Sequence, residues 1–131
     1  SEGISMSFTN FLETEILDHV FAGAAYSAPS QHYLGLFTAA PGEAGGGTEL
    51  SGSAYVRKAV NFATSGATTS NNAAIEFPTA TGSWGTVTHV GVFDAASSGN
   101  LMAYATLSSS KAIATGDVFR VPSGDLDITL N

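Results

Sequence analysis

Turn-forming residues after Gly23 divide most of this chain into short apolar runs. Clusters of glycine, proline, serine and asparagine separate segments that are rich in β-branched and aromatic residues and too short for helices. The predicted strands are His32 to Thr38, Ala54 to Phe62, Ala73 to Phe77, Thr86 to Phe93, Leu101 to Leu107, Val118 to Val121 and Leu126 to Leu130. This spacing predicts a mainly β protein, an antiparallel β-sandwich of about seven short strands. The absence of helical runs between the strands argues against a parallel sheet.

One N-terminal α-helix is predicted over about residues 8–22. Between Phe8 and Phe21, apolar residues recur three and four positions apart, which is the spacing of an amphipathic helix. Asn10 followed by Glu13 resembles a capping box, and Gly23 can close the C-terminal end. We therefore expect a helix of about three turns ahead of the strands.

Two connections between strands are distinctive. The segment DAASSGN predicts a turn that pairs Val90–Phe93 with Leu101–Tyr104 as an antiparallel hairpin. The stretch from Thr64 to Ala74 has low complexity and is expected to be a flexible surface connection.

The length of 131 residues suits one domain with one core. We expect residues 6–131 to form a single β-sandwich domain that includes the N-terminal helix. Residues 1–5 precede Met6 and are expected to be a non-native extension, with the natural start at Met6. A mass spectrum of the native protein tests that expectation.

The net charge of −7 limits the classes of partner. Nucleic-acid binding normally needs a basic stripe, and this chain has four Lys and Arg residues against eleven acids. No apolar run approaches the roughly 20 residues that span a bilayer. The sequence contains no cysteine, which excludes disulfides and thiolate metal sites. We therefore expect neither nucleic-acid binding nor membrane insertion, and stability from packing or from association with other chains.

Three consecutive glycines, Gly45, Gly46 and Gly47, raise the possibility of a phosphate-binding loop. Such a loop lies between a strand and a helix and ends in a lysine and a hydroxyl residue. Here the next lysine is Lys58, and Glu43 and Glu49 would repel a phosphate. The glycines are better interpreted as the flexible middle of an acidic loop between two strands.

No catalytic, metal-binding or cofactor-binding residues are predicted. The three histidines, His19, His32 and His89, lack a spacing that places two of them on one face of one element. The acids near the C-terminus do not form the ladder of oxygen ligands that calcium requires. There is also no GxSxG motif. An enzyme is therefore the minority interpretation.

Trp84 is the single tryptophan and lies between two glycines. Its ring can anchor the core or an interface, or it can stack on a sugar. Tyr55 and Tyr104 are the other candidate stacking residues for a host-surface glycan.

Several long segments together resemble the small bacteriophage proteins labelled tail fibre proteins. The segments are MSFTNFLETEILDHVFAG, YLGLFTAAPGEAGGGTELSGSAYVRKAV, FPTATGSWGTVTHVGVFDAASSGNLMAYATL and GDVFRVPSGDLDITL, and the resemblance runs from Met6 to the end. It implies a structural protein of the virion with no catalytic residues to transfer. A capsid decoration role and a tail-tip role fit the same resemblance.

The functional surface is therefore expected to be an interface. Candidate interface residues are Phe8, Leu12, Leu17, Phe21, Gly45, Gly46, Gly47 and Trp84. The favoured hypothesis is a homo-oligomer that docks on other virion proteins. The alternatives are a module that binds a host-surface carbohydrate and, from a third class, a small hydrolase of the cell envelope.

Overall fold

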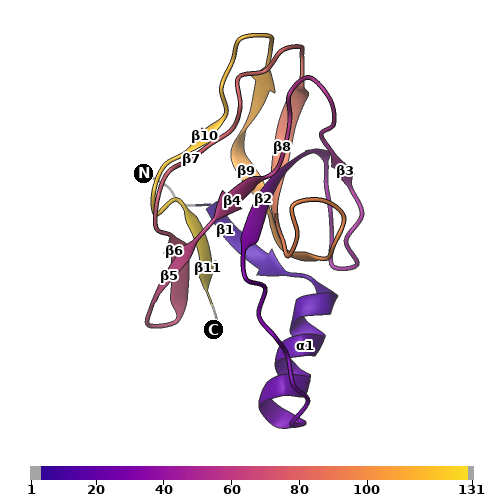
Figure 1. Cartoon of the computed structure of the whole chain (residues 1–131), viewed down its shortest axis with the longest axis vertical. Coiled ribbons are helices and arrows are strands. Elements are labelled where there is room, and N and C mark those ends of the chain that lie inside the picture. Colours follow the sequence, from indigo (N-terminus) through magenta and orange to yellow (C-terminus); the bar gives the residue numbers. More distant parts are fainter. Residues whose placement is uncertain (1–3, 130–131) are drawn as a thin grey trace.

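The computed structural model describes residues 4–129, which form one helix and eleven strands (Figure 1). The elements are β1 Ile4–Phe8, α1 Asn10–Phe21, β2 His32–Ala39, β3 Thr48–Glu49, β4 Lys58–Val60, β5 Phe62–Ser65, β6 Thr68–Asn71, β7 Ile75–Glu76, β8 Gly85–Phe93, β9 Leu101–Ile113, β10 Arg120–Val121 and β11 Leu126–Thr129. The predicted class, mainly β with one N-terminal helix, is confirmed.

The strands form one long sheet and a two-stranded ribbon. The long sheet has the order β3-β2-β8-β9-β1-β11-β6-β5, β4 pairs with β2, and β7 pairs with β10. The predicted hairpin is confirmed, because Val92 lies opposite Ala103 and Phe93 lies opposite Leu101. The long sheet folds over a core, so the arrangement is consistent with a sandwich in which β1 joins the two layers.

The expectation of purely antiparallel pairing is wrong at one place. β1 pairs with β11 in parallel, with Ile4 opposite Leu126 and Met6 opposite Ile128. Parallel pairing needs a long connection, and nearly the whole chain lies between these two strands. The origin of residues 1–5 stays a prediction, although Ile4 and Ser5 are part of β1.

The expected flexible connection after Thr64 is also wrong. β5 and β6 form a hairpin there that turns at Gly66, whose φ is +62°. β6 in turn pairs with β11, and the Ser70 hydroxyl donates a hydrogen bond to the Asp127 carboxylate. Pairing on both sides therefore orders a polar segment that has little apolar content of its own.

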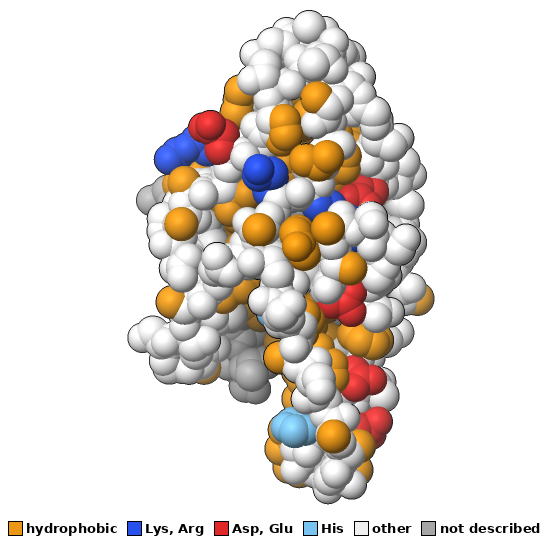
Figure 2. All heavy atoms as spheres, viewed as in Figure 1, with side chains coloured by type: hydrophobic (Ala, Val, Ile, Leu, Met, Phe, Trp, Pro, Cys, Tyr) orange, Lys and Arg blue, Asp and Glu red, His pale blue; other side chains and the backbone are white. Residues whose placement is uncertain are grey.

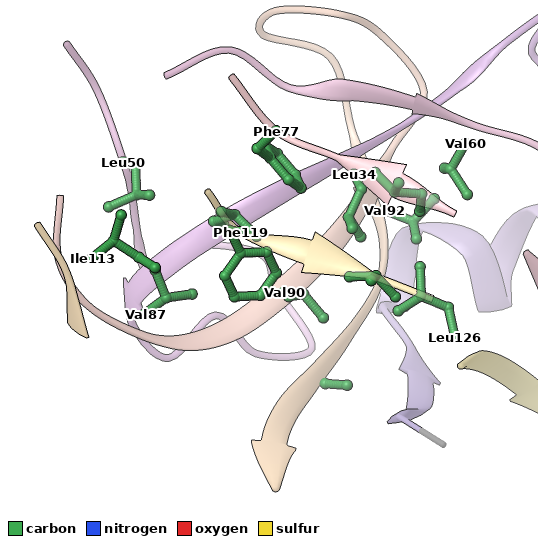
Figure 3. Close-up of a cluster of buried hydrophobic side chains, with 14 of the residues drawn as sticks. Leu34, Leu50, Val60, Phe77, Val87, Val90, Val92, Ile113, Phe119 and Leu126 are labelled. Atoms are coloured by element: carbon green, nitrogen blue, oxygen red, sulfur yellow. The ribbon is translucent and has the colours of Figure 1, made fainter. Parts of the chain in front are cut away.

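The main core lies between the long sheet and the segments that cross it. From the sheet, Leu34, Val90 and Val92 contribute side chains that are at most 2% exposed. Phe77 and Phe119 cover them from the other side, with ring centroids 5.7 Å apart in an edge-to-face arrangement. Figure 3 shows these side chains gathered in one cluster. Burial of this apolar area is the main contribution to the stability of the domain.

A smaller cluster lies on the opposite face of the sheet. Phe37 and Phe93 stack with centroids 5.9 Å apart and pack with Leu101. Gly35 and Gly91 lie opposite each other in β2 and β8 and leave room for these rings. A Cβ atom on Gly91 would lie 2.6 Å from Leu101 Cδ1, and one on Gly35 would lie 2.8 Å from Phe93 Cε2. A larger residue at either position would therefore force these side chains to shift.

The helix begins later than predicted. Phe8 belongs to β1, and Thr9, not Asn10, is the N-cap. The Thr9 side-chain oxygen accepts a hydrogen bond from the Leu12 amide and donates one to the Leu101 carbonyl at 2.7 Å. Thr9 therefore fixes the start of the helix against β9. Gly23 follows the helix with φ at +74°, as its predicted role at the C-terminal end requires.

Candidate functional site

Among the described residues, the most exposed large apolar side chains lie on α1. The helix projects from the body of the protein and forms its lower end in Figure 1, and Figure 2 shows hydrophobic side chains along it. Phe21 is 80% exposed, Val20 60% and Leu17 58%. Not one residue of α1, which lies entirely within the described chain, is buried. The helix therefore lacks the tertiary packing that normally stabilises a helix of this length.

The apolar side chains occupy one continuous arc at the far end of α1. At 100° per residue, Ile16, Val20, Leu17 and Phe21 follow one another around about 140° of the helix. Asp18 and His19 lie outside this arc. An arc of that width is typical of a helix that packs against neighbouring elements. The structure thus places the predicted interface residues Leu17 and Phe21 together on an exposed surface.

An apolar groove of about 280 Å³ lies beside the base of the helix. Phe8 and Leu12 line it from the N-terminal side, and Phe62, Met102 and Ile128 line it from the strands. Two predicted interface residues therefore share one site. His32 also lines the groove, with its ring edge-on to Phe62 at 6.0 Å between centroids. Partial burial lowers the pKa of His32, and the nearby Asp94 carboxylate opposes this shift.

Trp84 does not belong to this surface. Its side chain is 5% exposed, and its Nε1 donates a hydrogen bond to the Ser53 carbonyl at 2.9 Å. The Tyr55 ring packs edge-on against it, with centroids 5.6 Å apart. The interface assignment of Trp84 is therefore wrong for this chain, since the ring is a core anchor. Neither Trp84 nor Tyr55 offers a free face for a sugar, whereas Tyr104 is partly exposed.

The three consecutive glycines adopt a backbone conformation that favours glycine. Gly45, Gly46 and Gly47 all have positive φ, from +77° to +85°, which other residues rarely adopt. A Cβ atom on Gly47 would lie 2.7 Å from the Pro41 nitrogen. The loop is held in place because the Glu43 carbonyl accepts a hydrogen bond from the Asn10 amide at 2.8 Å. The loop is thus anchored at Glu43, and the flexibility of its glycines stays a prediction.

The glycine loop also borders a cleft of about 490 Å³. Thr9 and Asn10 line the cleft from the start of α1, and Gly99 and Asn100 line it from the β8–β9 connection. The Tyr104 hydroxyl donates a hydrogen bond to the Glu43 carboxylate, which raises the pKa of Tyr104. The loop is thereby positioned next to the helix, but on a different surface from the apolar groove.

The sequence analysis did not predict a polar cluster that surrounds Arg57. Arg57 donates to both oxygens of Glu49, with both distances 2.8 Å, and its Nη1 donates to the carbonyls of Ala95 and Ser98. The guanidinium carbon lies 3.4 Å from the centroid of the Phe93 ring. These contacts join the loop after β3 to the β8–β9 connection. We call Glu49, Tyr55 and Arg57 the clamp.

Tyr55 completes the clamp. Its hydroxyl donates to Glu49 at 2.6 Å and accepts a hydrogen bond from the Leu36 amide at 3.0 Å. Burial, followed by the hydrogen bond to Glu49, raises the pKa of Tyr55 far above its usual value. The chain carries no sequence signal for this cluster beyond an acid and an arginine eight positions apart. The polar groups bond to one another and to carbonyls of the β8–β9 connection, so the clamp holds loops together.

The described residues show neither a cluster of metal-binding side chains nor a helix that could cross a membrane. Within residues 4–129, no three His, Asp or Glu side chains are grouped so that they could hold a metal ion. In the same part of the chain, no helix has both the length and the apolar character to cross a membrane. The surface features considered further are the exposed arc of α1, the apolar groove and the cleft.

Comparison with protein families identifies the family. The family model described as podophage GP4 fiber I protein gp80 matches residues 7–129, so the chain belongs to this family. The family is one of phage fibre proteins, which places the chain in the virion, and such structural proteins are not typically enzymes. No curated protein matches the sequence.

Proposed function

We propose that this chain is a non-enzymatic structural subunit of a phage fibre that assembles with further copies of itself and docks on other virion proteins through α1. The observation that carries this proposal is the exposed arc of the helix. Leu17, Val20 and Phe21 are each more than half exposed on a helix that projects from the body. A twelve-residue helix is marginal in water without packing partners. Association with a neighbour supplies that packing.

The family supports a structural role, and the geometry argues for an interface over a carbohydrate site. The rings of Trp84 and Tyr55 pack on each other inside the domain. A sugar-binding platform normally needs an aromatic face open to solvent. The host-glycan alternative therefore retains only Tyr104 of its three aromatic candidates.

The test is the mass of the protein in solution. We expect the wild-type chain to show a mass of more than one copy by light scattering, with dissociation on dilution. Phe21→Asp and Val20→Asp are each expected to shift the mass to one copy, because a charge in the apolar arc must be desolvated in the contact. The far-UV circular dichroism of each variant is expected to match that of wild-type protein diluted to single chains, since both side chains are exposed.

Val118→Asp is the matched control. Val118 is an exposed valine outside α1, at 44% exposure, so the charge change is the same in a different place. The control is expected to keep the wild-type mass. A wild-type mass of one chain at high concentration, together with no binding to virions, would contradict the proposed function.

A further inference from the structure

Two apolar surfaces at the base and the far end of α1 face in different directions. Leu12 faces the groove, which it lines together with Phe8. At 100° per residue, Leu17 lies about 140° and Phe21 about 180° around the helix from Leu12. We call Leu17 and Phe21 the plug. Because the plug points away from the groove of its own chain, it cannot fill that groove.

We propose that the plug of one copy occupies the apolar groove of the next copy. This inference rests on the proposed function and adds which two surfaces meet. Leu17 and Phe21 are four positions apart, so their side chains lie side by side on the helix. Their exposed fractions of 58% and 80% leave both side chains available to a neighbour. The groove, lined largely by Phe62, Met102, Ile128 and the base of α1, offers apolar side chains to both.

The charges of the two surfaces are compatible. The chain carries a net charge of −7, so contact between two copies needs places that lack acidic side chains. Among the described lining residues of the groove there is no acid, and His32 is the titratable one. Asp18 lies about 60° around the helix from Phe21, at the edge of the plug. Asp94, which acts on His32 electrostatically, is not among the lining residues, so Asp18 and Asp94 both lie at the rim of the seated plug.

A contact between plug and groove joins two different patches of the surface. Such a contact is heterologous, and it repeats from copy to copy until a ring closes or a filament grows. Each copy then contributes one plug and one groove. A two-fold dimer in which the helices pack on each other would leave both grooves empty. The two arrangements therefore differ in which residues lie across the contact.

Disulfide trapping distinguishes them, because the natural chain has no cysteine. ¹⁵N-labelled Phe21→Cys protein is mixed with unlabelled Phe62→Cys protein and oxidised, and the linked species are identified by intact mass. We expect the labelled–unlabelled pair to form at least about tenfold more than either like pair, because a disulfide requires Cα atoms within about 7 Å. Thr69→Cys, which lines the groove from the neighbouring strand β6, provides a second acceptor if Phe62→Cys does not fold.

Phe21→Cys mixed with Val118→Cys is the control and is expected to give no preferred mixed pair. A dominant link between two Phe21→Cys chains would overturn the plug-and-groove contact while leaving the proposed function standing. Absence of any preferred link in a sample with a multimeric mass would also overturn it. A mass of one chain would overturn the plug-and-groove contact, and only together with no binding to virions would it also overturn the proposed function.

Discussion

Replacing Trp84 by alanine is expected to lower the free energy of unfolding by about 3–5 kcal/mol, as for other large aromatic residues removed from a core. The indole ring is 5% exposed and packs against Tyr55, and its N–H is bonded to the Ser53 carbonyl. Truncation leaves a cavity and removes one of the two hydrogen bonds to the Ser53 carbonyl, which keeps the bond from the Thr81 amide. Urea denaturation followed by circular dichroism measures the change.

Trp84→Phe is the matched control because it keeps an aromatic ring and loses the N–H group. We expect it to cost clearly less than Trp84→Ala. At concentrations where both variants are folded, we also expect the mass in solution to equal that of the wild type. A stability loss below about 1 kcal/mol for Trp84→Ala, or a change of mass with stability unchanged, would contradict the assignment of Trp84 to the core.

Glu49→Gln is expected to lower the free energy of unfolding by about 1.5–3 kcal/mol, the range for hydrogen bonds to charged groups, because the ion pair is only partly buried. The substitution keeps the shape of the side chain but leaves the Arg57 guanidinium, at 8% side-chain exposure, without its countercharge. The Tyr55 hydroxyl also loses a charged acceptor. Thermal and urea unfolding of the two proteins measure the difference.

Glu76→Gln makes the same chemical change at an exposed position of β7. The control is expected to stay within about 0.5 kcal/mol of the wild type. Equal small effects of both substitutions would mean that the clamp does not hold the β8–β9 connection. A large effect of Glu49→Gln alone supports its role in joining the two loops.

The existence of α1 could be predicted from its own residues, but its first residue could not. The apolar spacing up to Phe21 is a local pattern and predicts the helix correctly. Phe8 fits the same spacing, yet it lies in β1 opposite Ala103 of β9. That pairing joins residues far apart in the chain. Local periodicity carries no information about such a partner.

Sheet pairings at long range account for the other errors. The polar strand β6 is ordered because β5 and β11 pair with its two edges, and its residues alone look like a loop. The parallel pairing of β1 with β11 likewise depends on where the chain ends meet. By contrast, the β8–β9 hairpin follows from a local turn. Its two paired segments, Val90–Phe93 and Leu101–Tyr104, were predicted from the sequence.

In the candidate site, too, local sequence patterns predicted some residues correctly, whereas long-range packing decided the place of others. Leu12, Leu17 and Phe21 were identified from helical spacing, and they lie on the groove and the exposed arc. For Trp84 the sequence left a core role and an interface role open, and the hydrogen bond to Ser53 and the packing against Tyr55 place it in the core. Sequence spacing thus predicts which helix residues are apolar. Which side chains remain exposed is decided by the fold around them.

Hydrogen–deuterium exchange along α1 tests most directly whether a neighbouring copy covers the helix. At concentrations where the protein is assembled, we predict slow exchange for the amides of Ile16 to Phe21, and fast exchange after dilution to single chains. Amides of β8, in the centre of the sheet, serve as the reference and are expected to exchange slowly in both samples. Fast exchange along α1 in a fully assembled sample would contradict the account.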